Sequence, residues 1–138
     1  MRHVKEKNIL RIVDANLNRL KEGLRVCEDT ARFVLNDTKA TKELKAIRHN
    51  VNKSIERLGY KQLVAARCVE TDVGKRDKKS EFSRRTTSDI FYANAQRCKD
   101  SIRVLEEYAK LLDTTSAKQL KRLRYAFYVI EKRMVSKI

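Results

Sequence analysis

The strongest constraint on the fold of this chain is a helical pattern that occurs twice. Residues 15–34 align with residues 93–112 without a gap, and eight of the twenty aligned positions are identical. The segments that follow also correspond, since L-K-A-I-R-H at 44–49 matches L-K-R-L-R-Y at 120–125. A repeat of this kind is typical of one supersecondary unit used more than once. The unit is predicted to be a helical hairpin, present in two copies.

Apolar residues recur at alternating steps of three and four, which is the pattern of a helix with one buried face. The predicted helices span about 9–35, 41–58, 88–113 and 116–136. The buried face of the first is formed by Leu10, Val13, Leu17, Leu20, Leu24, Cys27, Ala31 and Val34. The chain has no Pro and only three Gly, so little interrupts these helices.

The predicted fold class is all-α: a four-helix bundle-like domain built from two repeated hairpins with approximate two-fold symmetry. One domain is expected over 1–138, with repeat one at about 9–58, a basic connector at about 59–87 and repeat two at about 88–136. Seams of this type also support coiled-coil dimers. Four helices joined by short loops within each pair favour packing inside one chain, while a homodimer through leftover apolar surface stays open.

The chain is strongly basic, with 33 Lys and Arg against 18 Asp and Glu, a formal charge of +15. Such an excess favours an anionic partner (nucleic acid, anionic membrane or phosphorylated small molecule), unless it only solvates the surface. No apolar run approaches the roughly 18–20 residues that cross a bilayer, and the N-terminus lacks a signal-peptide core. We therefore expect a cytoplasmic protein without a membrane partner.

Three cysteines occur, and none has the C-x-x-C spacing of a metal or redox motif. Cys27 and Cys98 fall on apolar helical positions, where Cys behaves as a small hydrophobe. Together with Cys68 they are interpreted as structural thiols.

Both copies of the repeat contain A-N-x-x-R-x-K-[ED]-x-x-R-V-x-E. Asn16 and Arg19 flank the apolar seam of the first copy, and Asn94 and Arg97 repeat that arrangement in the second. Polar groups beside a core need partners, which are either the other hairpin or a bound anion. Arg suits bidentate phosphate contacts, so one hypothesis is a symmetric cleft lined by these four side chains. The alternative is a ladder of ion pairs three residues apart, which stabilises helices weakly.

Four more basic residues of the repeat are candidate phosphate ligands: Arg25, Arg103, Arg48 and Arg124. The first two lie in the charged motif, and the other two occupy matching places on the second helix of each hairpin. The alternative for the second pair is a structural role, in which they form ion pairs with Glu28 or Glu106.

The connector is where the repeat stops, and that asymmetry suggests function. Asp72 opens a D-V-G turn, and its carboxylate could bind Mg²⁺. Basic residues that could reach phosphates are Lys75, Arg76, Lys78, Lys79, Arg84 and Arg85, and Glu81 could orient one of the arginines. The alternative is a solvated basic loop. No P-loop, zinc-ligand pattern or G-x-S-x-G elbow is present, so a nucleotide site here would be of an unusual kind.

Several motifs together resemble one known family. They are R-I-V-D-A-N-L-N-R-x-x-E-G-L-R-V-x-E-D-x-A-R-F-V-L at 11–35, L-K-x-I-R-H at 44–49, A-R-x-x-x-x-D-V-G at 66–74, E-x-x-R at 81–84 and A-N-x-x-R-x-x-D-x-I-R-V-L-E-E-Y-A-K at 93–110. Nearly the whole chain resembles the small helical hydroxymethylpyrimidine phosphate kinase family of thiamine biosynthesis. That family occurs alone or fused ahead of thiamine-phosphate synthase, and its members often carry the synthase name. Cys68 departs from its pattern, which has an acidic residue after the equivalent of Arg67.

The resemblance implies transfer of the γ-phosphoryl group of ATP to hydroxymethylpyrimidine phosphate, with Mg²⁺ as cofactor and a nucleotide and a phosphorylated pyrimidine as partners. On this hypothesis Arg97, Arg19 and Asp72 are catalytic, and Asp72 is also the Mg²⁺ ligand. Substrate and phosphate contacts are assigned to Asn16, Asn94, Arg25, Arg103, Arg48, Arg124 and Arg84. The alternative class is a basic helical module that binds nucleic acid or protein without catalysis, although the basic residues are dispersed.

Overall fold

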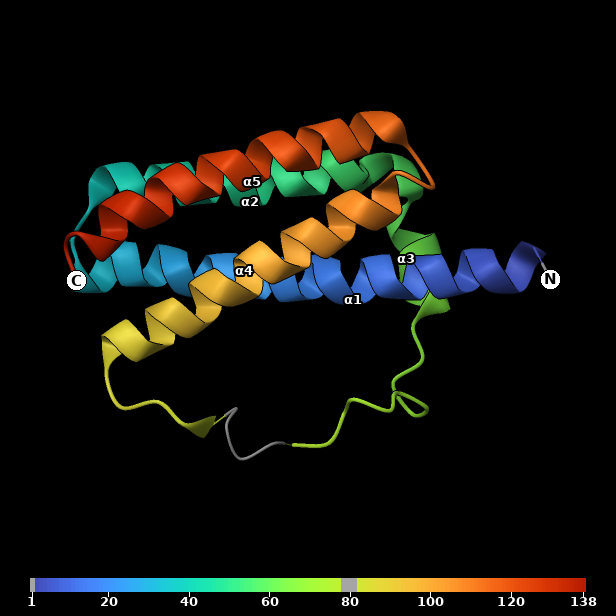
Figure 1. Ribbon diagram of the computed structural model, residues 1–138, viewed down its shortest axis with the longest axis horizontal. Helices are drawn as coiled ribbons and strands as arrows, with labels where there is room; N and C mark the ends of the chain where they lie inside the picture. The colour runs from blue at the N-terminus through green and yellow to red at the C-terminus, as the bar shows by residue number, and fades with distance from the viewer. Residues whose placement is uncertain (1, 78–81) are drawn as a thin grey trace.

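The computed structural model describes residues 2–77 and 82–138, with side chains from residue 5 onward. In these ranges the backbone forms helices and no strands, which confirms the all-α class (Figure 1). The elements are α1 (Arg2–Asp29), a π-helical turn η1 (Thr30–Val34), α2 (Thr38–Ile55), a 3₁₀ turn η2 (Glu56–Leu58), α3 (Tyr60–Ala66), α4 (Thr87–Ala109) and α5 (Thr114–Val135). None of the helices described combines the length and the apolar character needed to cross a bilayer.

Polar caps set the starts of three long helices. Asp37 caps α2, where its carboxylate accepts a hydrogen bond from the Ala40 amide at 3.0 Å. Thr86 and Asp89 form a capping box at the start of α4, and Asp113 caps α5. These caps satisfy amides that the first helical turn leaves unpaired, so the helices begin one to three residues earlier than the apolar pattern indicates. The first helix begins about seven residues earlier, because residues 2–8, all polar except Val4, are also helical.

The prediction of an irregular connector from residue 59 is wrong for α3. Gly59 has a φ of +79°, a value that favours glycine, and it turns the chain from η2 directly into α3. Leu63 and Ala66 are buried, and α3 packs against α1. A helix of seven residues with two apolar anchors carries too short a pattern to stand out in the sequence.

Four long helices enclose the core. α1 and α2 run antiparallel, as do α4 and α5, and the most extensive interface is between α1 and α4 (Figure 1). The core includes Val13, Leu20, Leu24, Cys27, Leu44, Val51, Phe91, Cys98, Ile102, Leu105, Leu120 and Met134. Gly23 allows the close approach of α1 and α4, because a Cβ atom there would lie 2.8 Å from the Cys98 Sγ and 3.2 Å from the Asn94 carbonyl oxygen. The two-fold symmetry of the hairpins stays an interpretation.

Candidate functional site

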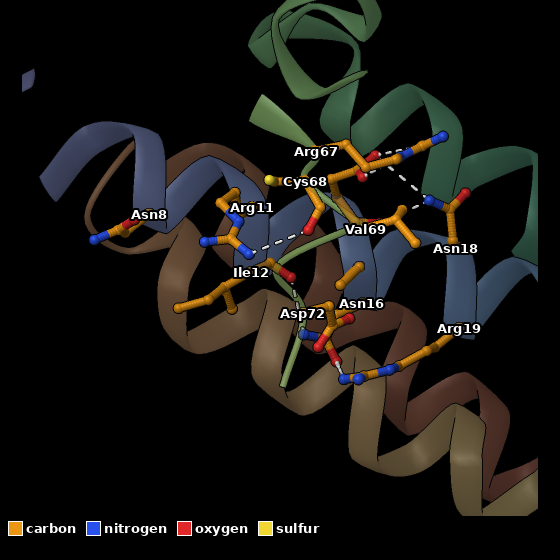
Figure 2. A pocket seen from close by; sticks show the side chains of 12 residues that line it. Asn8, Arg11, Ile12, Asn16, Asn18, Arg19, Arg67, Cys68, Val69 and Asp72 are labelled. Atoms are coloured by element: carbon orange, nitrogen blue, oxygen red, sulfur yellow. Dashed lines mark hydrogen bonds and ion pairs between the residues drawn. The ribbon is translucent and has the colours of Figure 1, made fainter. Parts of the chain in front are cut away.

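A hollow of about 550 Å³ lies between the first half of α1 and the segment that follows α3. The residues that line it are Asn8, Arg11, Ile12, Asp14, Ala15, Asn16, Asn18, Arg19, Arg67, Cys68, Val69 and Asp72. Figure 2 shows these side chains gathered around one space, with the segment from Arg67 to Asp72 passing across α1 and Asp72 lying beside Asn16 and Arg19. The hollow therefore unites one end of the repeat with the connector, which are separate in the sequence.

One ion pair holds the two walls of this hollow together. Arg67 donates two hydrogen bonds to Asp14, from Nε to Oδ2 at 2.7 Å and from Nη2 to Oδ1 at 2.9 Å. Asp14 is only 5% exposed, and its hydrogen bonds and negative charge raise the pKa of the Arg67 guanidinium. A bidentate pair of this kind fixes both distance and orientation. The segment after α3 is thereby anchored to α1.

Two other guanidinium groups face the hollow without a carboxylate partner. Arg11 donates a long 3.5 Å hydrogen bond to the Cys68 carbonyl oxygen, and Arg19 donates one of 3.4 Å to the Oδ1 of Asn16. Among the ion pairs of the described residues, none involves Arg11 or Arg19. Eight residues separate them, which is about 12 Å along a helix. Two uncompensated positive charges at this spacing make the hollow suited to an extended anion such as a polyphosphate.

Asn16 is placed by its own helix. Its Nδ2 donates to the Ile12 carbonyl oxygen at 2.9 Å, so its Oδ1 is directed to Arg19. The side chain is buried, and its hydrogen-bond partners lie on α1. Asn16 thus orients Arg19 toward the hollow.

Asp72 also lines the hollow, and its side chain is exposed. Its Oδ1 accepts a hydrogen bond from the Gly74 amide at 2.8 Å, which forms the predicted turn. No group of three or more His, Cys, Asp or Glu suited to a metal occurs in the part of the chain that the structure describes. One carboxylate beside an anion site nevertheless fits Mg²⁺, which keeps several waters and commonly binds one or two carboxylates plus substrate phosphates.

Cys68 stands at the rim of the hollow. Its Sγ lies 2.9 Å from the Thr71 Oγ1, and hydrogen bonds from the hydroxyl and the amide of Thr71 lower the pKa of the thiol. The other two cysteines are buried. The neighbouring Cys27 and burial raise the pKa of Cys98, so the Cys68 thiol is more accessible and more acidic than the Cys98 thiol.

Four residues of the hollow were missed by sequence reasoning: Arg11, Asp14, Asn18 and Arg67. Asp14 falls between two core residues of α1, where a carboxylate needs a distant partner, and this was a usable signal. Position 14 aligns with Tyr92 in the second copy, just outside the part of the repeat that is conserved within the chain. The anchor for residues 67–72 therefore exists in one copy only.

The second copy does not contribute to this hollow. Asn94 makes the same helical hydrogen bond as Asn16, to the Ile90 carbonyl oxygen at 2.8 Å, but neither Asn94 nor Arg97 lines the hollow. Arg97 is half exposed and reaches Glu22 of α1 at 3.8 Å. Of the four residues predicted to line a symmetric cleft, Asn16 and Arg19 line the hollow and Asn94 and Arg97 do not.

Arg48 and Arg124 form the structural ion pairs that were the alternative in the sequence. Arg124 binds Glu106 through two hydrogen bonds, at 2.7 and 3.3 Å, and donates to the Tyr128 hydroxyl at 3.1 Å. Arg48 makes longer contacts to Glu28, of 3.3 and 3.4 Å, and its buried Nε has no partner among the described residues. The guanidinium of Arg124 in the second copy therefore has more complete hydrogen bonding than that of Arg48 in the first copy.

The remaining candidates lie in other surroundings. Arg25 and Arg103 bind Glu28 and Glu106 at 3.0 and 3.5 Å, which places them in the same two networks. Arg25 and Arg48 also line a groove of about 520 Å³ that shares Asn18 with the hollow. Arg84 is exposed and donates to the Ser83 carbonyl oxygen. The candidates Lys78, Lys79 and Glu81 lie outside the described residues.

A sequence model of the ThiD2 family matches residues 11–133. The chain belongs to the ThiD2 family. The match includes α1 from Arg11 onward, the segment that forms the far wall of the hollow, and both copies of the repeat. No solved structure matches this chain.

Curated relatives of this ThiD2-family chain are longer proteins. It is 39% identical over 129 residues to a thiamine-phosphate synthase of Rhodopirellula baltica, which covers 93% of this chain and 34% of that protein. It is 37% identical over 126 residues to one of Thermosynechococcus vestitus (91% and 35%), and 36% identical over 128 residues to one of Nostoc punctiforme (92% and 35%). The chain thus spans about a third of the length of these relatives.

Proposed function

We propose that this chain is a phosphotransferase of thiamine biosynthesis that transfers the γ-phosphoryl group of ATP to hydroxymethylpyrimidine phosphate in the cytoplasm. The observation that carries the proposal is the pair Arg11 and Arg19, which face one hollow without a carboxylate partner while Asp72 lines the same space. The family match and the name of the relatives, thiamine-phosphate synthase, support the pathway. The motifs that resemble the hydroxymethylpyrimidine phosphate kinases support the kinase reaction.

In the proposed reaction a phosphate oxygen of the acceptor attacks the γ-phosphorus of ATP. A new O–P bond forms, and the bond between the γ-phosphorus and the β,γ-bridging oxygen breaks, so ADP leaves with that electron pair. The acceptor oxygen is already anionic, so little proton transfer is needed, and the main obstacle is repulsion between two polyanions. Arg11 and Arg19 would reduce this repulsion and stabilise the charge spread over the transferred group.

Asp72 would hold Mg²⁺, which when bound supplies positive charge to the polyphosphate. Asn16 would keep the Arg19 guanidinium in position, and the Arg67–Asp14 pair would keep Asp72 close to α1. Arg25 and Arg48, in the adjoining groove, would contact further phosphate oxygens. The proposal also includes a role for Arg97, which reaches α1 from α4, and contacts from Asn94, Arg103 and Arg84.

The test is incubation of the protein with MgATP and hydroxymethylpyrimidine phosphate, with detection of the diphosphate and of ADP. Arg11→Ala and Arg19→Ala should each reduce kcat/KM by about 10²-fold, as expected when one charge-stabilising group is lost. Arg97→Ala tests the role that the sequence motif assigns to the second copy. Arg32→Ala is the matched control, since Arg32 is an exposed arginine on η1 outside the hollow.

Absence of product from a folded sample would overturn the proposal. The same sample should then be tested for binding to unrelated DNA duplexes, because the charge of +15 favours a nucleic-acid module as the second candidate. Micromolar binding that weakens steeply with salt would support that module. Formation of thiamine phosphate and pyrophosphate from added hydroxymethylpyrimidine diphosphate and thiazole phosphate would instead assign this chain the activity named for its relatives.

A further inference from the structure

The hollow that Arg11 and Arg19 face is called the anion hollow below. A second hollow, of about 300 Å³, adjoins it on the α2 and α3 side of α1. It is lined by Asp14, Leu17, Asn18, Lys21, His49, Asn52, Lys53, Ile55, Glu56, Tyr60 and Leu63. Asp14 and Asn18 line both hollows, so these two side chains form the partition between them. The Asp14 carboxylate is fixed by Arg67, and Asn18 donates to the Asp14 carbonyl oxygen at 3.0 Å. One ligand could therefore extend from one hollow into the other past a rigid partition.

The base of the second hollow is apolar and its rim is aromatic and polar. Leu17, Ile55 and Leu63 are buried and form the apolar part of the lining. Tyr60 is 79% exposed although it stands beside these residues, and His49 is also exposed. An apolar lining with a few polar groups is typical of a site for a small cyclic molecule. An exposed aromatic ring at the rim suits stacking on a flat ligand.

The repeat supplies an internal comparison. His49 and Asn52 align with Tyr125 and Tyr128 of the second copy. There the two tyrosines pack edge to face, with ring centroids 5.7 Å apart, and the Tyr128 hydroxyl accepts a hydrogen bond from Arg124. In the first copy smaller polar side chains occupy these positions and line an open hollow. The copy that lies next to the anion hollow is thus the one that keeps space for a ring.

We propose that the second hollow binds the aminopyrimidine ring of a substrate whose phosphates lie in the anion hollow. This ring chemistry is shared by adenine and by hydroxymethylpyrimidine, so the ligand is either the nucleotide or the acceptor of the proposed reaction, and the inference rests on that proposal. The ring covers Leu17 and Leu63 and stacks on Tyr60. The amide of Asn52 and the imidazole of His49 are the neighbouring hydrogen-bonding groups for ring nitrogens and the amino group.

The chain contains no Trp, so a Tyr60→Trp variant carries a single tryptophan, which serves as a fluorescent reporter at the rim. The variant is titrated separately with adenosine, hydroxymethylpyrimidine and inorganic tripolyphosphate. We expect a saturable change with one of the two rings and none with tripolyphosphate. A response to adenosine assigns the hollow to the nucleotide, and a response to hydroxymethylpyrimidine assigns it to the acceptor. Tyr125→Trp, a half-exposed position on α5, is the control and should respond to neither ring.

A lack of response to both rings, or an equal response of the Tyr125→Trp control, would overturn the inference. A kinetic measurement separates this result from failure of the proposed function. Tyr60→Ala should raise the KM of the assigned substrate about tenfold and leave kcat nearly unchanged, because the ring contact is equal in the ground state and the transition state. Normal turnover with an unchanged KM would refute the ring site and leave the kinase proposal intact. A ring response in a protein without kinase activity would support the ring site and refute the kinase proposal.

Discussion

Arg48 and Arg124 occupy matching positions in the two copies of the repeat, and we predict that their loss has unequal consequences. Arg124 and Glu106 are both buried, with side chains 11% and 4% exposed, and the guanidinium makes three hydrogen bonds. Its contacts with Glu106 and Tyr128 raise the pKa of Arg124. Arg48 is 27% exposed, and its two contacts to Glu28, at 3.3 and 3.4 Å, are longer than the 2.7 Å contact between Arg124 and Glu106.

The magnitudes follow from what each substitution leaves behind. Arg124→Gln leaves Glu106 buried with Arg103 as its remaining ion-pair partner at 3.5 Å. Removing one partner of a buried pair costs about 3–5 kcal/mol, and the remaining arginine favours the lower limit, about 3 kcal/mol. Arg48→Gln removes a partly solvated pair and leaves Glu28 its stronger contact to Arg25 at 3.0 Å, so we expect about 1 kcal/mol.

Urea denaturation followed by circular dichroism at pH 7 measures this difference. With a slope of about 2 kcal/mol per molar urea, the midpoint should fall by about 1.5 M for Arg124→Gln and by about 0.5 M for Arg48→Gln. Arg122→Gln, at an exposed position of α5, is the control and should stay near the wild-type midpoint. Equal shifts for the two matched variants, or a larger shift for Arg48→Gln, would refute the assignment of Arg124 to a structural role.

Three further predictions test the caps, the thiol and the turn. The pKa of Asp37 is lowered by the Ala40 amide and then by Lys137, so its stabilising effect is present above the unfolded-state pKa of about 4 and is lost as the pH falls through the lower folded pKa. The stability gap between wild type and Asp37→Asn should therefore narrow as the pH falls below about 4. Iodoacetamide should alkylate Cys68 alone in the native protein, and tripolyphosphate should slow that reaction, as peptide mass mapping would show. Gly59→Ala should cost about 1–3 kcal/mol in urea denaturation, because alanine is strained at a φ of +79°.

Each of these has a contrary outcome. A stability gap for Asp37→Asn that is constant with pH would show that the carboxylate charge contributes nothing. Alkylation of Cys68 at the same rate with and without tripolyphosphate would place the anion elsewhere. Gly74→Ala is the control for the turn, since an added Cβ there meets only the Asp72 Oδ1, at 3.4 Å, and a loss as large as that of Gly59→Ala would remove the backbone explanation.

The long helices could be predicted because their signals are local. Apolar residues at steps of three and four decide which face of a helix is buried, whatever that face later packs against. The residues predicted for the core are largely those that are buried, although Val34 is about half exposed because the π-helical turn η1 shifts the register at the end of the helix. The helix α3 escaped prediction because seven residues, of which only Leu63 and Ala66 are buried, are too few to define a period.

The sequence by itself determined the all-α class, the repeat and the candidate polar residues, including Asn16, Arg19 and Asp72. It could not decide which copy of the repeated Asn and Arg would face a hollow, since both copies carry the same residues at the same spacing. Tertiary structure decided this through the Arg67–Asp14 pair, which joins residues 53 positions apart and has no equivalent in the second copy. A helical pattern specifies neighbours within a few turns, whereas this ion pair depends on where the chain returns after Gly59, and that is set by packing of α3 on α1.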